Sequence, residues 1–154
     1  MRFVIVCLLT LIFVSCEPFD FRLKLVNKTN YKVRYFYSVM NEQEIIPNWR
    51  PCDSLVFDYI LPKEEEIIKS TTKWDFKLKN HPNKILRIYI LNEDTFRKYT
   101  TCEFVNGKTV YYKHDDLHNY NLYDVFKYQL FLKRYDLKFD DLIKADWEII
   151  YDGK

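Results

Sequence analysis

Over residues 19–25 every second side chain is apolar, and the same alternation resumes over residues 31–39 after a short polar stretch. A period of two is typical of a strand with one buried face, so both stretches are predicted to be strands. We expect them to pair with each other in antiparallel fashion. Most tyrosines on the apolar side of the second stretch are expected to pack in the core, namely Tyr31, Tyr35 and Tyr37.

Turn residues divide the rest of the chain into short elements. Asn106-Gly107 lies between two alternating runs and best accepts the positive φ angles of a type I′ turn, which predicts a hairpin of residues 101–105 and 108–112. Residues 84–91 are nearly all apolar, as expected of a central strand covered on both faces. Further strands are predicted at residues 55–60, 67–72, 74–78, 129–135 and 147–151, and short helices at residues 93–99, 122–128 and 140–145.

Many short strands with two or three short helices predict a mainly β fold, a two-layer β-sandwich of short antiparallel strands. An α+β fold is the alternative. Residues 41–53 contain Pro47 and Pro51 and show no period, so they are predicted to form a loop. Trp49 in this loop is the aromatic residue that we most expect to be exposed, and it is a weak candidate for binding a glycan or a protein.

The first fifteen residues differ from everything that follows. After Met1-Arg2, residues 3–14 are apolar except for Thr10. Twelve residues are too few for a helix that spans a bilayer, which needs about 20, but they suit the hydrophobic region of a signal peptide.

The next residues, Phe13-Val14-Ser15-Cys16, resemble a bacterial lipobox. This resemblance implies cleavage just before Cys16 and a diacylglycerol on its thiol, so that acyl chains anchor the protein without a spanning helix. The alternative is an ordinary signal peptide with a cysteine that happens to lie near its cleavage site.

Removal of residues 1–15 would leave 154 − 15 = 139 residues, enough for one hydrophobic core. We therefore expect a signal peptide at residues 1–15, a lipidated tether at 16–18 and a single β-rich domain at 19–154. Without Arg2 this chain has 23 Lys and Arg residues against 22 Asp and Glu residues. Such a balance gives no indication of nucleic-acid binding.

The four cysteines are divided between these parts. Cys7 would leave with the signal peptide and Cys16 would carry the lipid, so Cys52 and Cys102 remain in an oxidising compartment. A disulfide between them is predicted, with two unpaired thiols as the alternative. It would close a loop of about 50 residues and stabilise the fold by about 4 kcal/mol in the chain-entropy model.

The end of the chain carries a second resemblance. Lys133-Arg134-Tyr135-Asp136-Leu137, Asp141-Leu142 and Trp147-Glu148-Ile149-Ile150-Tyr151 are similar to the C-terminus of small Bacteroidetes lipoproteins of unknown function. The resemblance implies a place in the cell envelope, at the outer membrane, with the periplasmic or the surface face left open. It implies no activity. Lys138 stands where those proteins usually have Thr or Ser as the cap of the final helix, which puts the start of that helix in doubt.

Candidate chemistry is sparse. His114 and His118 would share one face of a helix and suit Zn²⁺, but they lie in a segment without an apolar period, so a solvated loop is the better interpretation. With Gly107 and Gly153 as its only glycines, the chain cannot form a glycine-rich phosphate loop or a nucleophile elbow. We therefore expect neither an enzyme nor a cofactor.

These observations lead to three hypotheses. The first is a lipid-anchored envelope protein with a non-enzymatic binding or structural role. Its partners would be the membrane, through the lipid on Cys16, and a protein or a glycan. The second is a secreted inhibitor or immunity-type protein, which would share the small size and the lack of catalytic motifs. The third is a metal-dependent hydrolase at His114 and His118.

Overall fold

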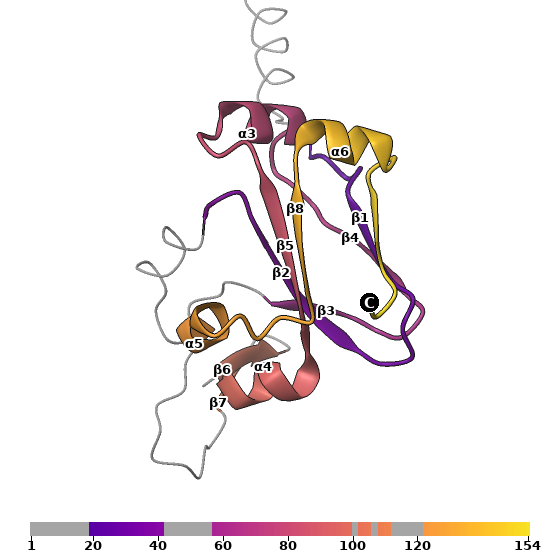
Figure 1. The fold of residues 1–154 in the computed structure, drawn as a ribbon. Coiled ribbons are helices and arrows are strands. Elements are labelled where there is room, and N and C mark those ends of the chain that lie inside the picture. The colour runs from indigo at the N-terminus through magenta and orange to yellow at the C-terminus, as the bar shows by residue number, and fades with distance from the viewer. Residues whose placement is uncertain (1–18, 42–56, 100–101, 106–107, 112–121) are drawn as a thin grey trace, which may run out of the picture.

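A computed structural model describes residues 19–41, 57–99, 102–105, 108–111 and 122–154. Two sheets make up most of this part (Figure 1). The three-stranded sheet has the order β4 (Glu65–Ile67), β1 (Lys24–Asn27) and β9 (Glu148–Tyr151). The four-stranded sheet has the order β3 (Asp58–Ile60), β2 (Val33–Ser38), β5 (Leu86–Asn92) and β8 (Lys133–Leu137). A separate hairpin consists of β6 (Cys102–Val105) and β7 (Lys108–Tyr111).

Four short helices complete the described part: α3 (Trp74–Asn80), α4 (Glu93–Tyr99), α5 (Leu122–Lys127) and α6 (Phe139–Lys144). Figure 1 shows α3 and α6 together at one end of the sandwich, with α4 and α5 at the other. The mainly β fold and the β-sandwich predicted from the sequence are thus confirmed, although the helices exceed the two or three expected. We call the end with α3 and α6 the entry end, because Asp20 is joined there to the start of α3 through the Trp74 amide.

One buried cluster fills the space between the two sheets. It draws Leu25 and Ile149 from the three-stranded sheet, and Tyr35 and Ile88 from the four-stranded sheet. A second cluster covers the opposite face of the four-stranded sheet with side chains of α4 and α5. The inner strands of the four-stranded sheet are therefore covered on both faces. This confirms the prediction that β5 is a central strand covered on both faces.

The predicted pairing of the first two strands is wrong. β1 lies between β4, to which it is antiparallel, and β9, to which it is parallel, whereas β2 pairs with β3 and β5 in the other sheet. Both strands direct apolar side chains into the same core, so their alternation is compatible with neighbouring strands or with facing ones. The parallel partner of β1 is the last strand of the chain, which local sequence patterns cannot indicate.

Three further expectations are corrected. Residues 74–78 form the first part of helix α3, not a strand, because the four-residue spacing of Trp74 and Leu78 buries both on one helical face. The strand expected from residue 19 begins only at Lys24. Before it, Phe19 and Phe21 are exposed and Asp20 is buried, the reverse of the predicted alternation. The strand expected at residues 129–135 is shifted to Lys133–Leu137.

Other local predictions are confirmed. α4 and α5 lie where they were expected, and the Asn92 side chain accepts a hydrogen bond from the Thr95 amide at the start of α4. The hairpin β6–β7 has the register Val105 opposite Lys108, as a two-residue connection requires. Helix α6 begins at Phe139 despite the missing Thr or Ser, because the backbone amide of Lys138 donates to the Asp141 carboxylate at 2.9 Å.

The chain passes from one sheet to the other through a turn organised by Asn27. Its side chain is fully buried, and its amide nitrogen donates to the carbonyls of Tyr31 (2.8 Å), Leu61 (3.1 Å) and Ile60 (3.3 Å). Its carbonyl oxygen accepts from the backbone amide and the hydroxyl of Thr29. One side chain thus joins β1, the turn that follows it and the end of β3.

Replacement of Asn27 by aspartate should destabilise the protein. A carboxylate has the same shape but no N–H, so three carbonyl oxygens would face a buried negative charge. We expect Asn27→Asp to lower the free energy of unfolding by about 2–4 kcal/mol in a urea titration at pH 7. The exposed Asn30 provides the matched control, Asn30→Asp, which should unfold at the parental urea concentration. Equal midpoints for the two variants would contradict this account of the turn.

Candidate functional site

Most of the site residues predicted from the sequence lie outside the described part of the structure. Cys102 is the first residue of β6, but its candidate partner Cys52 is not described, so their disulfide stays a prediction. The other undescribed candidates are Cys16, Trp49, His114 and His118. The structure therefore does not test these candidates, and the sites of interest within the described residues are different ones.

The first is a charged cluster at the entry end, formed by Asp20, Arg22, Asp75 and Trp147. The Asp20 carboxylate is almost completely buried and accepts hydrogen bonds from Arg22 Nη2 at 2.6 Å and Nε at 3.0 Å. It also accepts one from the Trp74 backbone amide at 2.9 Å, which belongs to the first turn of α3. Asp20 therefore joins the beginning of the domain to this helix.

Arg22 extends the cluster in two directions. Its Nη2 contacts Asp75 of α3 at 2.5 Å, and its guanidinium carbon lies 4.0 Å from the centre of the Trp147 ring, where a cation–π contact forms. Trp147 lies between α6 and β9. Arg22 therefore bridges α3, through Asp75, and the segment that follows α6, through Trp147. We call these four residues the entry cluster.

The electrostatics of the entry cluster favour a structural role. Hydrogen bonds from the Arg22 side chain are the main cause that lowers the pKa of Asp20 from 3.8 to about 2, against burial, which by itself would raise it. A carboxyl group with so low a pKa stays ionised near neutral pH. It is therefore unsuited to donate or accept protons in catalysis, where the pKa should lie near the working pH.

Trp147 takes an unusual backbone conformation within this cluster. Asp146 and Trp147 have φ angles of 50° and 61°, in the left-handed region that bulky residues rarely adopt. The Trp147 amide donates to the Leu142 carbonyl at 2.8 Å, and its own carbonyl accepts from the Lys24 amide at 2.8 Å. This turn thus places β9 beside β1 and presents the indole to Arg22.

A second ionic cluster lies near the opposite end, where β2 meets α4. Arg34 is 3% exposed and makes a two-pronged contact with Glu93, with Nε at 2.8 Å from Oε2 and Nη2 at 3.1 Å from Oε1. Arg97 and Lys32 also contact the Glu93 carboxylate, at 2.9 and 3.1 Å. Burial by itself would raise the pKa of Glu93, but the hydrogen bonds of the three cations outweigh it and lower the pKa to about 2.

Neither cluster could be predicted from the alternation of side chains, which assigns Asp20, Arg22 and Arg34 to solvent. One signal was available for Arg34. Since residues 84–91 are apolar on both faces, a strand beside them must also be covered on both faces, including its polar positions. Burial of Arg34 and a carboxylate partner nearby could have been expected on that ground.

Most of the aromatic residues whose burial the structure describes belong to the core. Tyr35, Trp74, Tyr89 and Tyr151 are buried, and Tyr37 is half-buried against Trp74. Tyr31 is 44% exposed, contrary to expectation, although its hydroxyl lies 3.0 Å from that of Tyr151. The two tryptophans of the described part are both buried and present no flat platform for a sugar.

No group of three or more histidine, cysteine, aspartate and glutamate side chains among the described residues is placed to hold a metal ion. In the same part of the chain, no helix has the length and apolar character needed to cross a membrane. Comparisons with models of protein families, with curated proteins and with solved structures found no match for this chain. The resemblance to small lipoproteins thus stays a prediction.

The pKa of Asp20 predicts a dependence of stability on pH. Because this pKa is lower in the folded protein, the ionised carboxylate stabilises the fold above pH 4, and that contribution is lost as the pH falls through about 2. The difference between 3.8 and about 2 in the pKa of Asp20 corresponds to about 2 kcal/mol of stabilisation by the ionised carboxylate. Urea titrations should therefore show Asp20→Asn less stable than the parent by about this amount at pH 7, with a difference that shrinks toward pH 2.

The exposed Asp140 of α6 provides a matched control for this measurement. Asp140→Asn should leave the free energy of unfolding close to the parental value at both pH values. A constant difference between Asp20→Asn and the parent from pH 7 to pH 2 would show that the charge of Asp20 is not what stabilises the entry cluster.

Proposed function

We propose that this protein is anchored to a membrane of the bacterial envelope by lipid on Cys16, and that its β-sandwich is a non-enzymatic binding or structural module. The observation that carries the proposal is the apolar leader that ends in Phe13-Val14-Ser15-Cys16. The first described residue of the domain, Phe19, follows this cysteine by three positions. Such a short connection would hold the domain close to the membrane.

The ionic clusters of the domain support a binding or structural role. Asp20 and Glu93 are the described carboxylates whose pKa is lowered to about 2. Asp20 is held by Arg22, two residues away, and Glu93 by Arg34 of β2 among other cations. Their contacts join the start of the domain to α3 and β2 to α4. These charges, one buried and one half-buried, hold neighbouring segments together, and the surface would provide the binding function.

The lipid anchor can be tested by metabolic labelling of the full chain with a clickable fatty acid. We expect label on the parent and its loss in Cys16→Ala, because the thioether bond needs the thiol of Cys16. Cys7→Ala is the matched control, since Cys7 lies in the leader and should not affect labelling. If Cys16→Ala keeps the label, or the parent never acquires it, the anchor does not exist at this residue.

A further inference from the structure

Three phenylalanine side chains at the entry end are exposed to solvent. Phe19, Phe21 and Phe76 are 58%, 51% and 65% exposed, and Phe76 is the most exposed large apolar side chain among the described residues. The rings of Phe19 and Phe21 lie 6.0 Å apart. Asp20, between them, binds the Trp74 amide, and Arg22 binds Asp75, so both phenylalanines lie beside the first turn of α3.

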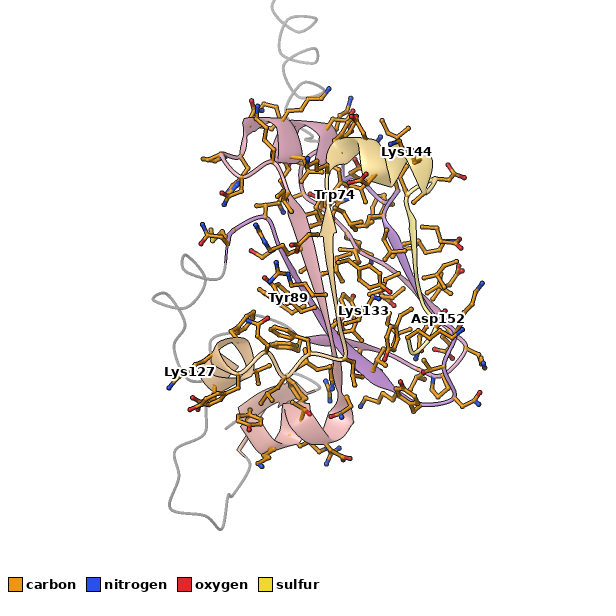
Figure 2. The ribbon with its side chains drawn as sticks, viewed as in Figure 1. Trp74, Tyr89, Lys127, Lys133, Lys144 and Asp152 are labelled. Atoms are coloured by element: carbon orange, nitrogen blue, oxygen red, sulfur yellow. The ribbon has the colours of Figure 1, made fainter. Side chains whose placement is uncertain are left out.

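Phe76 points away from the core. Trp74 and Leu78, two positions before and after it, are buried on one face of α3, and a rotation of 100° per residue places Phe76 on the opposite face. Figure 2 shows Trp74 on the inner side of α3, at the same end of the sandwich as Lys144 of α6. The ring of Phe76 therefore lies on the outer face of α3, exposed to solvent at the entry end.

Lysines are frequent in and just before α3, the helix that carries Phe76. Lys69, Lys73 and Lys79 are exposed, and between residues 69 and 79 four lysines stand against the single acidic residue Asp75. Exposed aromatic rings next to lysines are the composition of surfaces that enter the headgroup region of a bilayer, where the rings displace water and the cations meet anionic lipids.

The short connection between Cys16 and Phe19 limits how far the entry end can lie from the membrane. From Cys16 to Phe19 there are three residue steps, which span at most about 11 Å even when fully extended. A lipid on Cys16 would hold that residue at the level of the headgroups. Phe19 and Phe21 would then lie within or next to the interface, because the tether is too short to lift them clear of it.

We propose that the entry end, through Phe19, Phe21 and Phe76, docks on the phospholipid surface of the membrane that holds Cys16. This inference rests on the proposed lipid anchor and adds an orientation to it. α3 lies against the membrane, and α4 and α5, at the other end of the sandwich in Figure 1, face away from it. The surface offered to a partner is then the one around α4 and α5.

The test uses the full, lipidated chain in vesicles of phosphatidylethanolamine and phosphatidylglycerol, with the photo-reactive residue benzoylphenylalanine at position 76. The matched control carries it in place of Tyr128, which is 57% exposed just beyond α5. We expect lipid adducts at position 76 and none above background at position 128. Phe19→Ser with Phe21→Ser should reduce the adducts at position 76 while the acyl mass on Cys16 remains.

The outcomes separate the two proposals. Acylated protein with equally few lipid adducts at positions 76 and 128, or with adducts to protein at position 76, would overturn the docking and leave the anchor intact. Absence of the acyl mass on Cys16 would overturn the anchor and remove the reason for the docking. Circular dichroism of each variant confirms that these exposed substitutions leave the sandwich folded.

Discussion

Strand β1 is the middle strand of its sheet, and the architecture of this protein depends on that position. On one side β4 pairs with it, and on the other side β9, the last strand of the chain, pairs with it in parallel. Hydrogen bonds continue beyond the strand, from the Ile68 amide to the Leu23 carbonyl and from the Lys28 amide to the Tyr151 carbonyl. The first segment of the domain therefore cannot leave without unpairing two neighbours, unlike an ordinary terminal segment.

Next to β1 and β9, side-chain contacts connect the elements of the entry end. Asp20 and Arg22, just before β1, bind α3, and Trp147, just before β9, receives the Arg22 cation on its ring. The left-handed φ angles of Asp146 and Trp147 occur where α6 turns into β9. Strained backbone persists only where its surroundings fix it, and here hydrogen bonds to Leu142 and Lys24 do so. A force on the proposed anchor would thus pass into the core through β1.

Features that depend on neighbouring residues could be predicted from the sequence. The hairpin around residues 106 and 107, the central strand β5 and helix α4 follow from turn chemistry, an apolar run and a capping Asn92. The choice of partner for β1 could not be predicted, since alternation fixes which face of a strand is buried but not which strand lies beside it. Burial of Asp20 and exposure of Phe19 break the alternation, because the α3 helix covers one side of this segment only. Of the candidate site, the sequence indicates Cys16 through the lipobox, whereas the contacts that join Asp20 and Arg22 to α3 span more than fifty positions.

Strand β1 belongs to the core and would join the proposed anchor to the whole sandwich. Native-state hydrogen exchange measures this directly, through the free energies of opening for the amides of Lys24, Asn27 and Lys28 in β1 and just after it, compared with those of β5. We expect equal values within about 1 kcal/mol, because both strands would open only when the domain unfolds. Exchange of the β1 amides at a much lower free energy, as in a fraying terminus, would contradict it.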